Sequence, residues 1–97
     1  MNPAEARVLL REHLAQFRAL SLAELRALVP ASPFVGDRIA PSGVRYQIEV
    51  RLGWDDASGE AVRVVGAIDD SGWRALASMR EEFVVGPEPG RGGGEAG

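Results

Sequence analysis

A chain of 97 residues with 45% hydrophobic and 26% charged residues can build one modest hydrophobic core, which excludes a second folded domain. Cysteine is absent, which excludes disulfides, thiolate nucleophiles and cysteine-ligated metal sites. The net charge is −3 and the acidic excess lies in residues 41–97, so the basic face that a nucleic-acid-binding protein needs is not expected.

Two short helices are predicted at the start of the chain. The stretch "NPAE" places Asn2 at an N-cap and Pro3 at the first helical position, and apolar residues at helical spacing continue to about Phe17 or Arg18. The stretch "SLAE" predicts a second capped helix that begins after Ser21 and ends at Pro30. We expect the two helices to form a helical hairpin with one apolar face to bury.

No run of about 18 apolar residues is long enough to span a bilayer. The first residues, "MNPAEARVLLREHL", carry charges where a signal peptide needs an uninterrupted apolar stretch. We therefore expect a cytoplasmic protein without membrane contact.

Alternating apolar and polar residues predict two paired strands in the middle of the chain. Residues 30–43 are rich in Pro and Gly and are expected to form a connector without a strand. Residues 44–54 place an apolar side chain at every second position, and residues 62–69 repeat the pattern. The Asp-Asp pairs of the two intervening stretches, 55–59 and 69–72, are expected to form turns, because Asp and Gly favour turn conformations.

The segment 73–85 fits a strand pattern and, less well, a helix pattern. We expect a third strand from Trp73 to Met79 and a short fourth strand near residues 83–85. If the loop 69–72 has four residues, Val65 pairs with Leu76. The Gly- and Pro-rich residues 86–97 are expected to be a disordered tail behind a single domain of residues 1–85.

The predicted fold is therefore α+β, with an N-terminal helical hairpin packed on one face of a three- or four-stranded antiparallel β-meander. The stretches "SGVRYQIEVRLGWDD", "VRVVGAIDDSGWRA" and "EEFV" resemble a family of small uncharacterised bacterial proteins that share a VRV.G.IDD.GWRA core. The similarity covers about residues 42–90 and implies no known activity. The chain departs from the family where "PEPG" replaces a Pro-Asp-Gly turn.

The sheet face opposite the helices is the leading candidate for function. Its expected side chains combine a small apolar centre with a charged rim, which is the usual composition of a contact surface. The candidate residues are Gln47, Arg51, Arg63, Val65 and Leu76. This composition predicts a non-catalytic protein-binding or accessory domain that needs no cofactor. Its partner would be another protein or a second copy of the chain, and an inhibitor or immunity-type protein is one specific version.

The alternative hypothesis is a small hydrolase or metal-dependent enzyme. It would use Asp69 and Asp70 together with His13, the only histidine of the chain. His13 projects into the apolar arc of the first helix, where a histidine is usually a structural residue. Asp69, Asp70 and Arg74 are also a candidate polar cluster at one end of the sheet.

A third hypothesis is DNA binding through three arginines of the first helix, Arg7, Arg11 and Arg18. They lie within a narrow arc of the helix and could hold phosphates. The structural interpretation of the same three side chains is a helix edge paired with carboxylates of the sheet. The acidic second half of the chain favours this structural interpretation.

Overall fold

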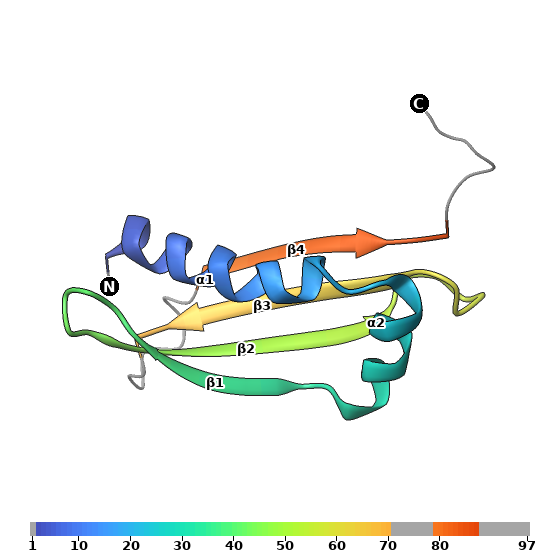
Figure 1. The fold of residues 1–97 in the computed structure, drawn as a ribbon, viewed down its shortest axis with the longest axis horizontal. Helices are drawn as coiled ribbons and strands as arrows, with labels where there is room; N and C mark the ends of the chain where they lie inside the picture. The colour runs from blue at the N-terminus through green and yellow to red at the C-terminus, as the bar shows by residue number, and fades with distance from the viewer. Residues whose placement is uncertain (1, 71–78, 88–97) are drawn as a thin grey trace.

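The computed structural model describes residues 2–70 and 79–87, which form two α-helices and one four-stranded antiparallel sheet (Figure 1). The sheet order β1-β2-β3-β4 follows the chain order, as in a meander. The structure is therefore α+β, as the sequence predicts. The elements in chain order are α1 (Pro3–Arg18), α2 (Leu22–Leu28), the 3-10 turn η1 (Val29–Ala31), β1 (Phe34–Ile39), β2 (Arg45–Trp54), β3 (Val62–Asp69) and β4 (Met79–Val85).

Both helices begin where the sequence predicts, because local hydrogen bonds satisfy their first backbone N–H groups. The side-chain oxygen of Asn2 accepts hydrogen bonds from the backbone nitrogens of Ala4 and Glu5 at the start of α1. At α2, the Ser21 hydroxyl accepts from the Glu24 nitrogen, and the Glu24 carboxylate accepts from the Ser21 nitrogen. No helix in the described ranges is long and apolar enough to cross a membrane.

The hydrophobic core lies between the helices and one face of the sheet (Figure 1). Helix α1 contacts β2, β3 and β4, while α2 contacts η1 and β3. The buried side chains come from the apolar stripes of the helices and from alternate positions of β2 and β3. The largest fully buried side chains are those of Tyr46, Leu10, Leu14, Leu25, Ile48, Ile68, Val50, Val62 and Val64.

Gly66 allows α1 to approach β3 closely. A Cβ atom at this position would lie 2.8 Å from Leu14 Cδ2 and 3.0 Å from Leu10 Cδ1. Both distances are below ordinary van der Waals contact, so the two leucines occupy the space that a side chain at position 66 would need. The helix therefore rests directly on the strand backbone.

Strand β1 corrects the prediction that residues 30–43 form a connector without a strand. It pairs with β2 from Phe34 opposite Val50 to Ile39 opposite Arg45. The segment was missed because only two of its side chains, Phe34 and Arg38, are half-buried, so it lacks the apolar alternation of a core strand. An edge strand of this kind forms through its backbone pairing with β2 and not through its own pattern.

Strand β4 (Met79–Val85) contains the expected short strand at 83–85 but begins four residues earlier, with Met79 opposite Ile68. The expected strand at 73–79 lies, apart from Met79, outside the described residues. Residues 79–85 are therefore not helical, which also excludes the helix alternative for this part of 73–85.

The predicted pairing of Val65 with Leu76 is wrong, because Val65 lies opposite Glu82. The prediction assumed that a four-residue loop leads directly into the next strand, whereas β4 begins nine residues after Asp70. Trp73, Arg74 and Leu76 lie outside the described residues. The predicted tail does as well, apart from Gly86 and Pro87.

Candidate functional site

The sheet face that points away from the helices carries the odd-numbered residues of β1, β2 and β3 and the even-numbered residues of β4, and we call it the open face. None of the described helices covers it (Figure 1). All four strands contribute, because residues that pair across an antiparallel sheet point to the same face. Odd residues pair with odd residues between β1, β2 and β3, whereas odd residues of β3 pair with even residues of β4. The members are Val35, Asp37, Ile39, Arg45, Gln47, Glu49, Arg51, Gly53, Arg63, Val65, Ala67, Asp69, Arg80, Glu82 and Val84.

The register places these residues in rows that cross the sheet, and two rows lie at its centre. The first central row consists of Val35, Glu49, Ala67 and Arg80. The second central row consists of Arg51, Val65 and Glu82. Each row thus has a small apolar residue of β3 in the middle and opposite charges on the two neighbouring strands.

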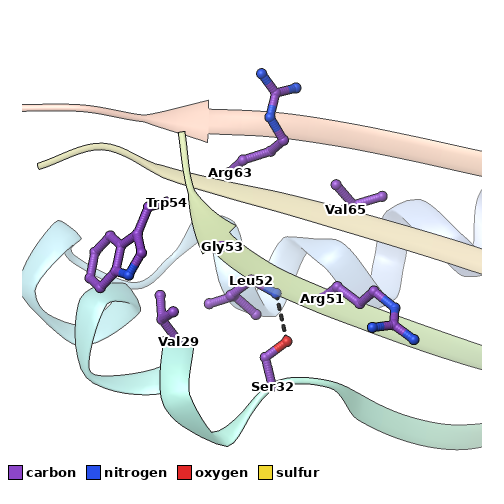
Figure 2. Close-up of a pocket in the computed structure, with 8 residues that line it drawn as sticks. All are labelled: Val29, Ser32, Arg51, Leu52, Gly53, Trp54, Arg63 and Val65. Atoms are coloured by element: carbon purple, nitrogen blue, oxygen red, sulfur yellow. Dashed lines mark hydrogen bonds between the residues drawn. The ribbon is translucent and has the colours of Figure 1, made fainter. Parts of the chain in front are cut away.

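A hollow lies beside the second central row (Figure 2). It has a volume of about 360 Å³, and Gly53 forms part of its wall. A Cβ atom on Gly53 would meet nothing within 4 Å, so the missing side chain is one reason for the hollow. Arg51, Arg63 and Val65 border it on the open face, and Trp54, whose residue is 49% exposed, borders it at the end of β2. A smaller hollow of about 240 Å³ lies over Ala67 and shares Arg51 and Val65 with the first.

The edge of β2 is also partly uncovered at this hollow. The pairing of β1 with β2 ends at Phe34 opposite Val50, so β1 does not continue alongside Leu52 and Trp54. The Leu52 nitrogen donates instead to the Ser32 hydroxyl at 2.8 Å (Figure 2). This side-chain bond takes the place of a backbone bond to β1, and Ser32 lies between η1 and β1.

Several charged side chains of the open face form ion pairs but remain exposed. Arg51 Nη2 lies 2.8 Å from Glu49 Oε2, and the two side chains are 65% and 36% exposed. Arg63 pairs with both Asp55 and Glu82. Exposed pairs of this kind contribute only about 0–1 kcal/mol to stability. These side chains can therefore change partners at little cost to the fold.

Four of the five predicted contact residues lie together on the open face. Arg51 and Val65 are direct neighbours across β2 and β3, and Arg63 and Gln47 lie one and two rows from them. The fifth, Leu76, is outside the described residues. The sequence reasoning missed Glu82 and Arg80, because it placed the last strand in the wrong register.

Two residues of the enzyme hypothesis, His13 and Asp69, lie on opposite sides of the sheet. His13 lies on α1, on the helix side of the sheet, whereas Asp69 belongs to the open face. Asp70 directly follows β3, and its charge acts on Tyr46. The His13 ring packs against Phe17 at a centroid distance of 6.3 Å. Burial, and then the positive charge of Arg38, lower the pKa of His13 below its usual value. In the described ranges, no three His, Asp or Glu side chains form a group that could hold a metal ion.

The three arginines of the DNA hypothesis contact strand β4. Arg11 Nε donates to both carboxylate oxygens of Glu81 at 3.2 Å, and Arg7 Nε lies 3.7 Å from the same carboxylate. The Arg18 guanidinium lies 4.2 Å from the centre of the Phe83 ring. These contacts favour the structural interpretation, in which the arginines attach α1 to β4.

One further polar contact joins the two layers. The Tyr46 hydroxyl, buried in the core, donates to Glu5 Oε1 at 3.0 Å, and Ser42 donates to the same oxygen at 2.8 Å. Burial, and then the hydrogen bond to Glu5, raise the pKa of Tyr46 above its usual value. This contact links the first turn of α1 to β2 on the side away from the open face.

No family model, no curated protein and no solved structure matches this chain. The resemblance to small bacterial proteins therefore stays a prediction.

Proposed function

We propose that the protein is a non-catalytic binding protein that acts through the open face. The observation that carries the proposal is the contrast between the two faces of one sheet. The helices cover one face, while the other presents the apolar residues Val65 and Ala67 and a hollow at Gly53, surrounded by exposed charges. A small apolar centre inside a charged rim is typical of protein contact surfaces.

The remaining candidates have structural roles, which supports binding over catalysis. The His13 ring packs against Phe17, Tyr46 and Glu5 link α1 to β2, and Arg11 attaches α1 to Glu81. A catalytic site would need either an acid or base within hydrogen-bonding reach of a nucleophile, or a group of side chains that holds a metal ion. The described part of the chain brings no such combination together on the open face.

The charges of the open face favour a protein partner over a nucleic acid. Four arginines, at positions 45, 51, 63 and 80, share the face with the carboxylates of Asp37, Glu49, Asp69 and Glu82. Because a nucleic acid is uniformly negative, a face of mixed charge repels it at as many points as it attracts it. A protein surface that carries both signs can match this pattern.

A capture experiment with matched variants tests the proposal. The tagged protein is used as bait in a lysate of its source organism, alongside the variants Val65→Glu and Val8→Glu. Val8 is 55% exposed on α1, so Val8→Glu makes the same chemical change away from the open face. We expect one stoichiometric protein that the wild type and Val8→Glu retain and that Val65→Glu loses. Capture that is the same for all three baits would refute binding through the open face.

Circular dichroism and thermal unfolding of each bait provide the control for folding. Val65 is only half-buried, and its substitution leaves the core side chains of β3 in place.

We propose in addition that the chain belongs to the small bacterial family that it resembles and that it acts in the cytoplasm.

A further inference from the structure

The charges of the two central rows of the open face are arranged in opposite order. From β2 to β4, the first row reads acidic, apolar, basic: Glu49, Ala67, Arg80. The second row reads basic, apolar, acidic: Arg51, Val65, Glu82. Along β2 and along β4, the sign of the charge therefore changes between one row and the next.

This pattern is self-complementary under one rotation. A half-turn about an axis that lies between the two rows, in the plane of the interface and perpendicular to the strands, places a second copy face to face with the first. The first row of one copy then faces the second row of the other, on the same strand. Glu49 faces Arg51 of the second copy, Arg80 faces its Glu82, and Ala67 faces its Val65.

The neighbouring rows fit the same rotation. Gln47 and Asp69 form the row outside the first central row, and Gly53 and Arg63 form the row outside the second. The rotation places Gln47 of one copy over Gly53 of the other, where the hollow has room for a side chain. It also places Asp69 opposite Arg63, a third pair of opposite charges.

We propose that a second copy of this chain covers the open face, in an isologous dimer with two-fold symmetry. The inference rests on the proposed binding function and names its partner. In this dimer the β2 strands of the two copies lie over each other, and every central charge faces an opposite charge. The ion pairs within each face are exposed, so their side chains can reach across the interface without loss of fold stability.

The dimensions of stacked sheets permit these contacts. Two packed sheets lie about 10 Å apart with strands about 30° from parallel. Because β2 lies about half a strand spacing from the centre of the sheet, this angle shifts its residues by only about 1 Å relative to the residues that they face in the second copy. For β4 the shift is about 4 Å, so the pair formed by Glu49 and Arg51 is aligned best and makes the sharpest test.

The size of the face predicts a weak dimer. The rotation leaves β1 without a facing strand, so three strands at about 4.8 Å spacing and about seven residues in length give a face of roughly 330 Å² per copy. This is below the roughly 800 Å² per partner of a standard stable interface. We therefore expect reversible association with a dissociation constant above about 1 μM, weakened by salt because the central contacts are charged.

Two charge-reversal variants test the arrangement. Glu49→Arg gives β2 two adjacent arginines, and Arg51→Glu gives it two adjacent glutamates. Each variant alone would place like charges opposite each other twice in the dimer, and we expect at least a tenfold weaker self-association than in the wild type. A mixture of the two variants places arginines opposite glutamates at both positions, so we expect a heterodimer at wild-type affinity or tighter.

Sedimentation equilibrium of the purified proteins, from about 10 μM to about 1 mM, measures each dissociation constant. Glu12→Arg makes the same change of charge as Glu49→Arg on α1, where its partner is Arg38, and should leave dimerisation unchanged. Circular dichroism checks that each variant is folded. Recovery of association in the mixture supports the proposed register, because a general effect of charge or of misfolding would not be rescued by mixing.

A wild type that stays monomeric throughout this range overturns the inference. Dimerisation that all variants retain also overturns it, since the dimer would then use another surface. Either result leaves the proposed function standing if the Val65→Glu bait still loses a different protein that the wild type captures. If the wild type neither dimerises through the open face nor captures a protein that Val65→Glu loses, the open face is not a binding surface.

Discussion

Substitution of Gly66 by valine should destabilise the protein, because this position has no room for a side chain. Its Cβ would already lie 2.8 Å from Leu14 Cδ2, and valine adds two further methyl groups between β3 and α1. Filling an already packed site typically costs about 1–3 kcal/mol, and three new carbons against two leucines belong at the upper end. Valine also fits a strand better than glycine by up to about 1 kcal/mol. The expected net loss is therefore about 2 kcal/mol.

The matched control is Gly36→Val in β1. Gly36 lies on the same side of the sheet, but a Cβ atom there would meet nothing within 4 Å. The same change of residue therefore keeps the gain in strand preference without the clash. The free energy of unfolding of Gly36→Val should be unchanged or higher than that of the wild type by up to about 1 kcal/mol. The difference between the two variants isolates the contact between helix and strand.

Urea unfolding followed by circular dichroism measures both free energies. For a domain of this size, a loss of about 2 kcal/mol corresponds to a fall of about 8–16 °C in the melting temperature. A Gly66→Val protein that is as stable as the wild type would refute the close packing of α1 on β3. A Gly36→Val protein that loses as much as Gly66→Val would show that the effect belongs to glycine in a strand and not to the helix contact.

Three further predictions concern the contacts between the layers. The pKa of Tyr46 is raised in the folded protein, so its contribution to stability should be complete below about pH 10 and should fall as the pH rises above that value. Tyr46 is the only tyrosine, and the chain has no lysine or cysteine whose titration would overlap with it. Urea unfolding between about pH 9 and pH 11 should show this fall in the wild type and not in Tyr46→Phe. The pKa of His13 is lowered in the folded protein, so its contribution to stability should be complete above about pH 6.5 and should fall as the pH decreases below that value. The loss of stability in acid should be smaller in His13→Gln than in the wild type. Equal acid sensitivity of the two proteins would contradict the lowered pKa. Glu81→Gln should lower the free energy of unfolding by about 0.5–1 kcal/mol at low salt and by less at high salt, because the arginine partners of Glu81 are at least half exposed. A double-mutant cycle with Arg11→Gln measures the coupling energy between Glu81 and Arg11. A coupling energy of zero would show that this contact does not stabilise the fold.

The open face was only partly predictable from the sequence. The alternation of residues 44–54 and 62–69 placed Gln47, Arg51, Arg63 and Val65 on one face, because the side-chain period of a strand is two in any context. Their neighbours on β4 were not predictable, because pairing between strands depends on the length of the connection between them. A shift of the register replaced the expected Leu76 by Glu82 opposite Val65.

The sequence by itself determined the helix starts and the two central strands. The bonds that cap helices α1 and α2 lie within a few residues of Asn2 and Ser21, and the apolar alternation of the central strands is written into neighbouring positions. Tertiary structure alone decided the edge strand β1, the register of β4 and the close approach of α1 at Gly66. These features depend on groups that are distant in the chain, so no local pattern contains them.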